Sequence, residues 1–182
     1  MPTWAWIVIA AGAALVLLAV AFGVLRANRR RRLQGQFGPE YDRATADAPT
    51  RREAEAELVE RQRRREELEI RPLSPGARGR YLHEWEVAQA RFVDDPQQAI
   101  GEADQLIQQV MRDRGYPVED FDRRAADLSV DHPDVVQNYR AGHAISRKTV
   151  RGEADTEELR QAMIHYRALF DELLETGERA RA

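Results

Sequence analysis

The hydrophobic pattern divides the chain into one long apolar run and a longer segment with amphipathic stripes. From Trp4 to Leu25 there is no charged residue. A helix rises about 1.5 Å per residue, so a run of this length spans the ~30 Å hydrocarbon core of a bilayer. The pattern therefore predicts one N-terminal transmembrane helix. Trp4 and Trp6 are expected in the aromatic belt at its outer end.

A cluster of arginines follows this run and predicts its orientation. Short flanking segments rich in Lys and Arg stay cytoplasmic, and residues 1–3 carry no charged side chain. We expect the N-terminus outside and the C-terminal domain in the cytoplasm, at the inner membrane. A cleaved signal peptide, the alternative, would need basic residues before a shorter apolar core. The predicted anchor spans residues 1–32 and ends with Leu25, Arg26, Arg29, Arg30, Arg31 and Arg32.

Two polar segments come next. Glycines and prolines in residues 33–49 predict a linker. Residues 50–71 predict a highly charged helix with a thin apolar stripe, in which Arg61 and Arg65 fall in the a/d seam. We expect an exposed stalk or a helix at the edge of the domain. The alternative is a dimeric coiled coil, which would make the chain a homo-oligomer through this stalk.

Helical periodicity continues over residues 72–176. Apolar residues recur at steps of three and four in about five segments, and no window alternates as a half-buried strand does. Short links between the segments predict an all-α domain, a compact bundle of about five helices. Residues 177–182 are expected to form a disordered tail. Predicted helix caps are Thr50, Ser74, Asp95 and Asp155.

The charge balance changes when the anchor is set aside. The chain has 28 Lys and Arg, of which five are the anchor arginines, leaving 23 against 31 Asp and Glu, or about −8. An acidic domain is a poor nucleic-acid binder, because such binding begins by neutralising phosphates. The expected partners are therefore the lipid bilayer and a protein, and not nucleic acid. The absence of cysteine excludes disulfides and thiolate metal sites.

No sequence pattern predicts a catalytic, cofactor or metal site. His132 and His143 are eleven residues apart, which on one helix separates them by ~16 Å, too far to share a metal ion. Ser129 lies near Asp131 and His132, but neighbours in sequence seldom form a hydrolase triad, and no G-x-S-x-G turn is present. We expect no catalytic residue, no cofactor, no metal ligand and no enzymatic activity.

The segment 123–140 mixes polar loop residues with an aromatic residue and a histidine that we expect to be exposed. It is the first place to look for a partner surface, with Ser129, Asp131, His132, Tyr139 and Arg140 as candidates. A structural interpretation is equally simple: Asp131 caps a helix and Tyr139 packs in the core.

The leading hypothesis is a membrane-anchored, non-enzymatic protein-interaction or scaffold module. One alternative is a small-ligand sensor or enzyme with a pocket between helices that contains His132, His143 or His165. Another is a structural spacer in an envelope complex.

Several segments resemble a family of uncharacterised bacterial proteins with one N-terminal membrane span. The resemblance implies the anchored, all-α architecture and implies no activity. The segments are FGPEYDR (37–43), RREAEAEL (51–58), IRPLSP (70–75), ARFVDDP (90–96), MRDRGYP (111–117) and ADLSVDHPDVVQNYR (126–140).

Overall fold

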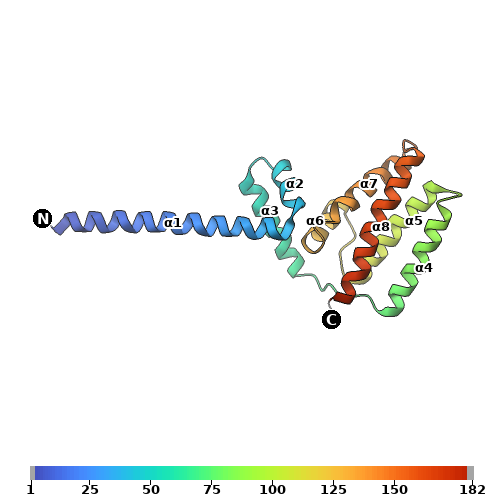
Figure 1. The fold of residues 1–182 in the computed structure, drawn as a ribbon, viewed down its shortest axis with the longest axis horizontal. Helices are drawn as coiled ribbons and strands as arrows, with labels where there is room; N and C mark the ends of the chain where they lie inside the picture. Colours follow the sequence, from blue (N-terminus) through green and yellow to red (C-terminus); the bar gives the residue numbers. More distant parts are fainter. Residues whose placement is uncertain (1–2, 180–182) are drawn as a thin grey trace. The chain divides into compact units, whose positions relative to one another are not determined.

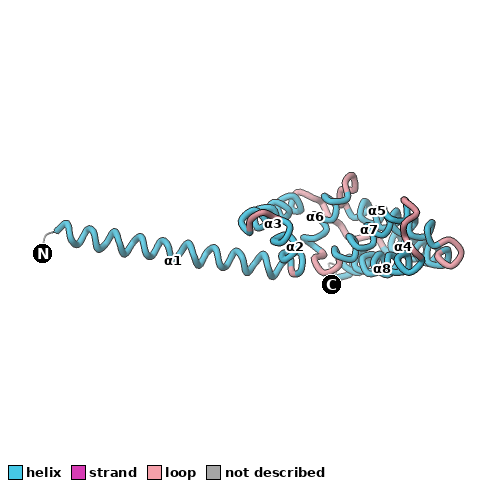
Figure 2. The backbone as a smooth tube through the Cα atoms, turned by 90° about the horizontal axis from the view of Figure 1, so that it is seen from above, coloured by secondary structure: helices cyan, strands magenta, loops and turns pink. Residues whose placement is uncertain are grey.

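The computed structural model consists of helices joined by short loops (Figures 1 and 2). It describes the backbone of residues 3–179 and the side chains of residues 12 and 15–175. Over that backbone there are eight helices and no strand, so the all-α prediction is confirmed. The chain forms two compact units, Met1–Glu55 and Ala56–Ala182, which are described separately.

The first unit begins with α1 (Thr3–Phe37), a helix of 35 residues. From Leu15 to Arg29 every residue of α1 is exposed. Among the described residues, no helix is both long enough and apolar enough to cross a membrane. The side chains of residues 4–11, 13 and 14 lie outside the described residues, and these include the predicted belt residues Trp4 and Trp6.

Residues 33–49 are mostly helical, so the linker predicted there is wrong. α1 continues to Phe37, and α2 (Pro39–Asp47) follows after Gly38, whose φ of 46° allows the chain to turn. The glycines and prolines in this segment indicate a linker, but the segment also contains an apolar stripe with the helical steps of four, four and three. Its members are Leu33, Phe37, Tyr41 and Ala44, and all four are buried.

α3 (Arg51–Glu66) ends five residues before the predicted boundary and is not an exposed stalk. Arg61 is 8% exposed, and Arg65 pairs with Asp131 on α6 (Phe121–Asp131). The polar positions that weaken a coiled-coil seam are therefore used for contact with another helix of the second unit.

The second unit also contains the predicted five-helix bundle. Its helices are α4 (Pro75–Arg91), α5 (Pro96–Arg114), α6, α7 (Val136–Val150) and α8 (Thr156–Arg179). α5 packs against α4, α7 and α8, and α8 packs against α7 (Figure 1). α8 extends to Arg179, into the segment where the sequence predicts a disordered tail; residues 180–182 lie outside the described residues.

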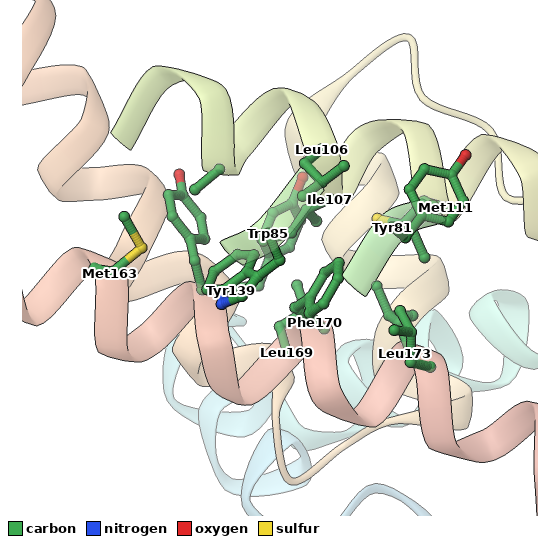
Figure 3. Packing of buried hydrophobic residues seen from close by; sticks show 14 of the residues in the cluster. Tyr81, Trp85, Leu106, Ile107, Met111, Tyr139, Met163, Leu169, Phe170 and Leu173 are labelled. Carbon is green, nitrogen blue, oxygen red and sulfur yellow. The ribbon is translucent and has the colours of Figure 1, made fainter. Parts of the chain in front are cut away.

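Aromatic and aliphatic side chains from these helices form one core (Figure 3). Trp85 of α4 stacks on Phe170 of α8, with ring centroids 4.6 Å apart and planes 21° apart. Met111 of α5 and Leu173 of α8 are 0% and 1% exposed. The apolar faces predicted from steps of three and four meet at this core.

The N-terminal caps predicted at Thr50, Ser74, Asp95 and Asp155 are confirmed, whereas Asp131 caps no helix: it is the last residue of α6, and the N-cap of α7 is Val135, which makes no side-chain cap bond. Side-chain oxygens of Thr50, Ser74 and Asp95 accept from the backbone N–H three residues later, at 3.3, 3.2 and 3.0 Å. Asp155 and Glu158 form a reciprocal pair of such bonds, at 2.8 and 3.1 Å. These bonds are local, which is why the sequence alone predicts them.

A close approach of α7 to α8 at Gly142 gives a testable prediction. A Cβ at this position would lie 2.8 Å from Cε1 of the Tyr166 ring, and Tyr166 is 0% exposed. We expect Gly142→Ala to lower the free energy of unfolding by about 1–3 kcal/mol, because the rigid ring has to move. Urea denaturation followed by circular dichroism measures this loss.

Gly101→Ala on α5 is the matched control, because a Cβ there meets nothing within 4 Å. In an exposed helix interior, alanine is expected to stabilise by about 0.5–1 kcal/mol relative to glycine. Equal effects of the two substitutions would contradict the close packing of α7 on α8.

Candidate functional site

An arginine-lined groove of about 460 Å³ lies in the first unit, between α1 and the start of α3. The residues from α1 recur at steps of three and four and therefore share one face of that helix. Arg51 and Glu55 of α3 complete the lining, on positions one turn apart. The residues of α1 in the lining are Gly23, Arg26, Ala27, Arg30, Arg31 and Gln34.

The groove is strongly cationic. Four guanidinium groups and one carboxylate give its lining a formal charge of about +3. The carboxylate of Glu55 accepts a hydrogen bond from the Tyr41 hydroxyl at 2.9 Å and is 9% exposed. Burial and Glu55 raise the pKa of Tyr41, while the guanidinium of Arg30 acts in the opposite direction. Tyr41 and Glu55 therefore form a polar support beside Arg30.

The groove is lined by three of the predicted anchor residues and by five residues of α1 and α3 that were not among the predicted site residues. Arg26, Arg30 and Arg31 line it, whereas Arg29 and Arg32 belong to the same cluster and are not part of its lining. The three-and-four spacing along α1 could have indicated the shared face. Arg51 and Glu55 could not have been found, because α3 reaches α1 only through the turn at Gly38 and the helix α2.

The predicted partner surface is largely buried. Ser129 and Tyr139 are 0% exposed and His132 is 3% exposed, so the expectation that His132 is exposed is wrong. Ser129 Oγ donates to the carbonyl of Ala126 at 2.6 Å. Asp131 is exposed and Arg140 is half-buried. The segment therefore offers a partner less surface than its composition predicts.

Part of this segment contacts α3 and the chain after α5. Asp131 pairs with Arg65 and also accepts a hydrogen bond from Tyr116 at 2.5 Å. Arg64 Nε lies 3.5 Å from the buried Asp127. Burial raises the pKa of Asp127, and Arg64 opposes this shift only in part. Asp131, one of the residues predicted to bind a partner, therefore helps to hold α6 against α3.

The four histidines have four different neighbours. His132 Nδ1 lies 3.1 Å from Glu172 Oε1, and burial together with Arg114 lowers the pKa of His132. His165 Nδ1 lies 3.0 Å from Asn138 Oδ1, and His83 is exposed at the surface of α4. Within the described residues, no three His, Asp or Glu side chains gather as metal ligands.

The remaining histidine belongs to a polar cluster around Asp104. Asp104 accepts hydrogen bonds from Tyr166 at 2.8 Å and from Gln108 at 2.6 Å. His143 stacks on Phe121, with ring centroids 3.7 Å apart, and its Nδ1 lies 3.9 Å from Asp104 Oδ1. Burial would raise the pKa of Asp104, but these polar neighbours outweigh it and the pKa is lowered. The cluster connects α5 to α7 and α8.

No family model, curated protein or solved structure matches this chain. The resemblance to single-span bacterial proteins therefore stays a prediction, and the functional argument depends on the geometry described above.

Proposed function

We propose that the chain is a single-pass membrane protein anchored by the apolar part of α1. The supporting observation is that this helix has large apolar side chains exposed on every side. Leu15, Leu18 and Leu25 are 70%, 71% and 69% exposed. Such a surface is unfavourable in water and favourable in the hydrocarbon core of a bilayer. Together with residues 4–14, it gives an uncharged run long enough to span that core.

The arginines after Leu25 orient this anchor. Because short segments rich in Arg are retained in the cytoplasm, the proposed topology places the N-terminus outside the inner membrane and the α-helical domain in the cytoplasm. This domain is acidic, so an anionic inner leaflet repels it while attracting the arginines.

The cytoplasmic bundle acts, in this proposal, as a non-enzymatic module that binds another protein. Two of its polar clusters are bonded internally: Asp104 with Tyr166, and Asp131 with Arg65 and Tyr116. These contacts give the side chains of both clusters structural roles. What the module presents to a partner is then its acidic outer surface.

Membrane integration is the first test. After carbonate extraction of membranes from expressing cells, we expect the full chain in the membrane pellet. Replacing Leu15 and Leu18 together with Arg should move most of it out of the pellet, because charges near the centre of a span strongly disfavour insertion. The control is Val87→Arg with Val93→Arg, two exposed positions in the bundle, which should stay in the pellet. Extraction of the unmodified chain by carbonate would contradict the anchor.

Topology and partner binding are tested on the same full-length chain. A reporter active only in the cytoplasm should work when fused after Ala182, and activity of an external reporter there would overturn the orientation. Crosslinking in intact membranes should yield one protein recurrently in near-stoichiometric amount. Recovery of the chain alone would contradict the interaction module.

A further inference from the structure

We propose that the arginine-lined groove binds the phosphate of an anionic phospholipid headgroup. The inference depends on the proposed membrane anchor, since the groove begins where the apolar run ends. Gly23 lies within that run, and Arg26 follows Leu25 directly. When α1 spans the bilayer, the groove is at the depth of the cytoplasmic headgroups.

The shape of the groove suits such a ligand. Its volume of about 460 Å³ is within the range of about 300–1,000 Å³ typical of small-molecule sites. At the end nearest the membrane the lining consists of Gly23 and Ala27, and even a Cβ added to Gly23 would meet nothing within 4 Å. Small residues at that end leave room for the glycerol and the first acyl carbons beside the helix.

The arginines supply the recognition chemistry. A guanidinium group presents a planar fork of donors that matches the oxygens of a phosphate. Arg26, Arg30 and Arg31 present such groups from α1, and Arg51 presents another from the first turn of α3. The N-terminal end of a helix also favours a nearby anion. Arg30 Nε is buried and has no hydrogen-bond partner among the described residues, so it lacks an acceptor of the kind that a phosphate supplies.

A built site differs from general attraction between arginines and an anionic membrane. General attraction counts charges near the surface, so every arginine of the cluster contributes alike. A site requires the arginines that line it. The chain offers two matched pairs of neighbours, in which one arginine lines the groove and the next does not: Arg31 with Arg32, and Arg51 with Arg52.

The experiment measures binding of short-chain phosphatidylglycerol to the full chain in neutral detergent, by titration calorimetry. Arg31→Gln and Arg51→Gln are expected to weaken binding roughly tenfold, because each removes charge-assisted hydrogen bonds to the phosphate. Arg32→Gln and Arg52→Gln remove the same charge and are expected to change binding by less than about twofold. Short-chain phosphatidylcholine and inorganic phosphate are the comparison ligands.

Each outcome decides the proposal. Tighter binding of phosphatidylglycerol than of both comparison ligands, lost on Arg31→Gln and Arg51→Gln, supports it. If both variants of a pair weaken phosphatidylglycerol binding equally, the arginines act only through general attraction to an anion, and the proposed site is wrong. If inorganic phosphate binds as tightly as phosphatidylglycerol, the groove recognises free phosphate and not a lipid headgroup. Failure of the anchor would be seen separately, as carbonate extraction of the unmodified chain, while binding of the soluble short-chain lipid could still be measured.

Discussion

Trp85→Ala is expected to lower the free energy of unfolding of the bundle by about 3–5 kcal/mol. Trp85 is 1% exposed and stacks on Phe170, which is 0% exposed (Figure 3). Removing the indole deletes a large apolar surface and leaves a cavity that the surrounding helices fill only in part. The guanidinium of Arg167 also loses its contact with the indole ring, whose centroid lies 5.9 Å away.

Equilibrium unfolding in urea measures this loss, with the helical signal followed by circular dichroism. Val150→Ala is the control, because Val150 is 87% exposed and its truncation should change stability by less than about 0.5 kcal/mol. A loss below about 1 kcal/mol for Trp85→Ala would mean that α4 does not belong to the cooperative core formed with α5 and α8.

The helices of this bundle are predictable because their signals are local. An apolar step of three or four and a cap three residues from its acceptor are contained within one or two turns of chain. Asp95 illustrates this, since its side chain caps α5 through the N–H of Gln98. Local signals also misled at residues 33–49, where Gly38 and Pro39 were interpreted as a linker although they make a sharp turn between two helices.

Contacts between distant helices were not predictable in the same way. The sequence shows that Arg61 and Arg65 interrupt an apolar seam, but not that their guanidinium groups meet side chains of α6 some 66 to 68 residues later. Arg51 is likewise one arginine among many in a charged helix, and only the approach of α3 to α1 makes it part of a groove. Charged residues therefore revealed little about their roles until the fold supplied their neighbours.

The same reasoning explains why three residues of the predicted partner surface are buried. Ser129, His132 and Tyr139 stood out because the segment mixes polar residues with a histidine and an aromatic residue, a composition that a short helix buried on more than one side also has. α6 is such a helix, with Asp127 and Leu128 2% and 0% exposed. Buried polar groups need partners within the protein: Arg64 of α3 pairs with Asp127, and His132, directly after α6, lies against Glu172 of α8.

Asp104→Ala is expected to destabilise the bundle by about 2–4 kcal/mol, because it removes the acceptor for donors from two helices. Tyr166 is 0% exposed and would lose its 2.8 Å bond to Asp104, while Gln108 would lose one of 2.6 Å. Asp104→Asn keeps an acceptor of the same shape and is expected to cost less than the alanine variant. Tyr166→Phe deletes only one donor, and its loss of stability should be smaller than that of either Asp104 variant.

The pH dependence of stability distinguishes the contribution of the Asp104 charge from that of the side chain's shape. Its pKa in the folded protein is lowered from 3.8, so in acid the unfolded chain takes up the proton first. The carboxylate therefore stabilises the fold above pH 3.8, and this contribution is lost as the pH falls from there through the lower pKa of the folded state. Asp104→Asn should show a shallower loss of stability than the unmodified protein over that interval, measured by urea unfolding at several pH values. Parallel pH profiles would mean that His143, Tyr166 and Gln108 stabilise the side chain by shape alone and do not favour its charge.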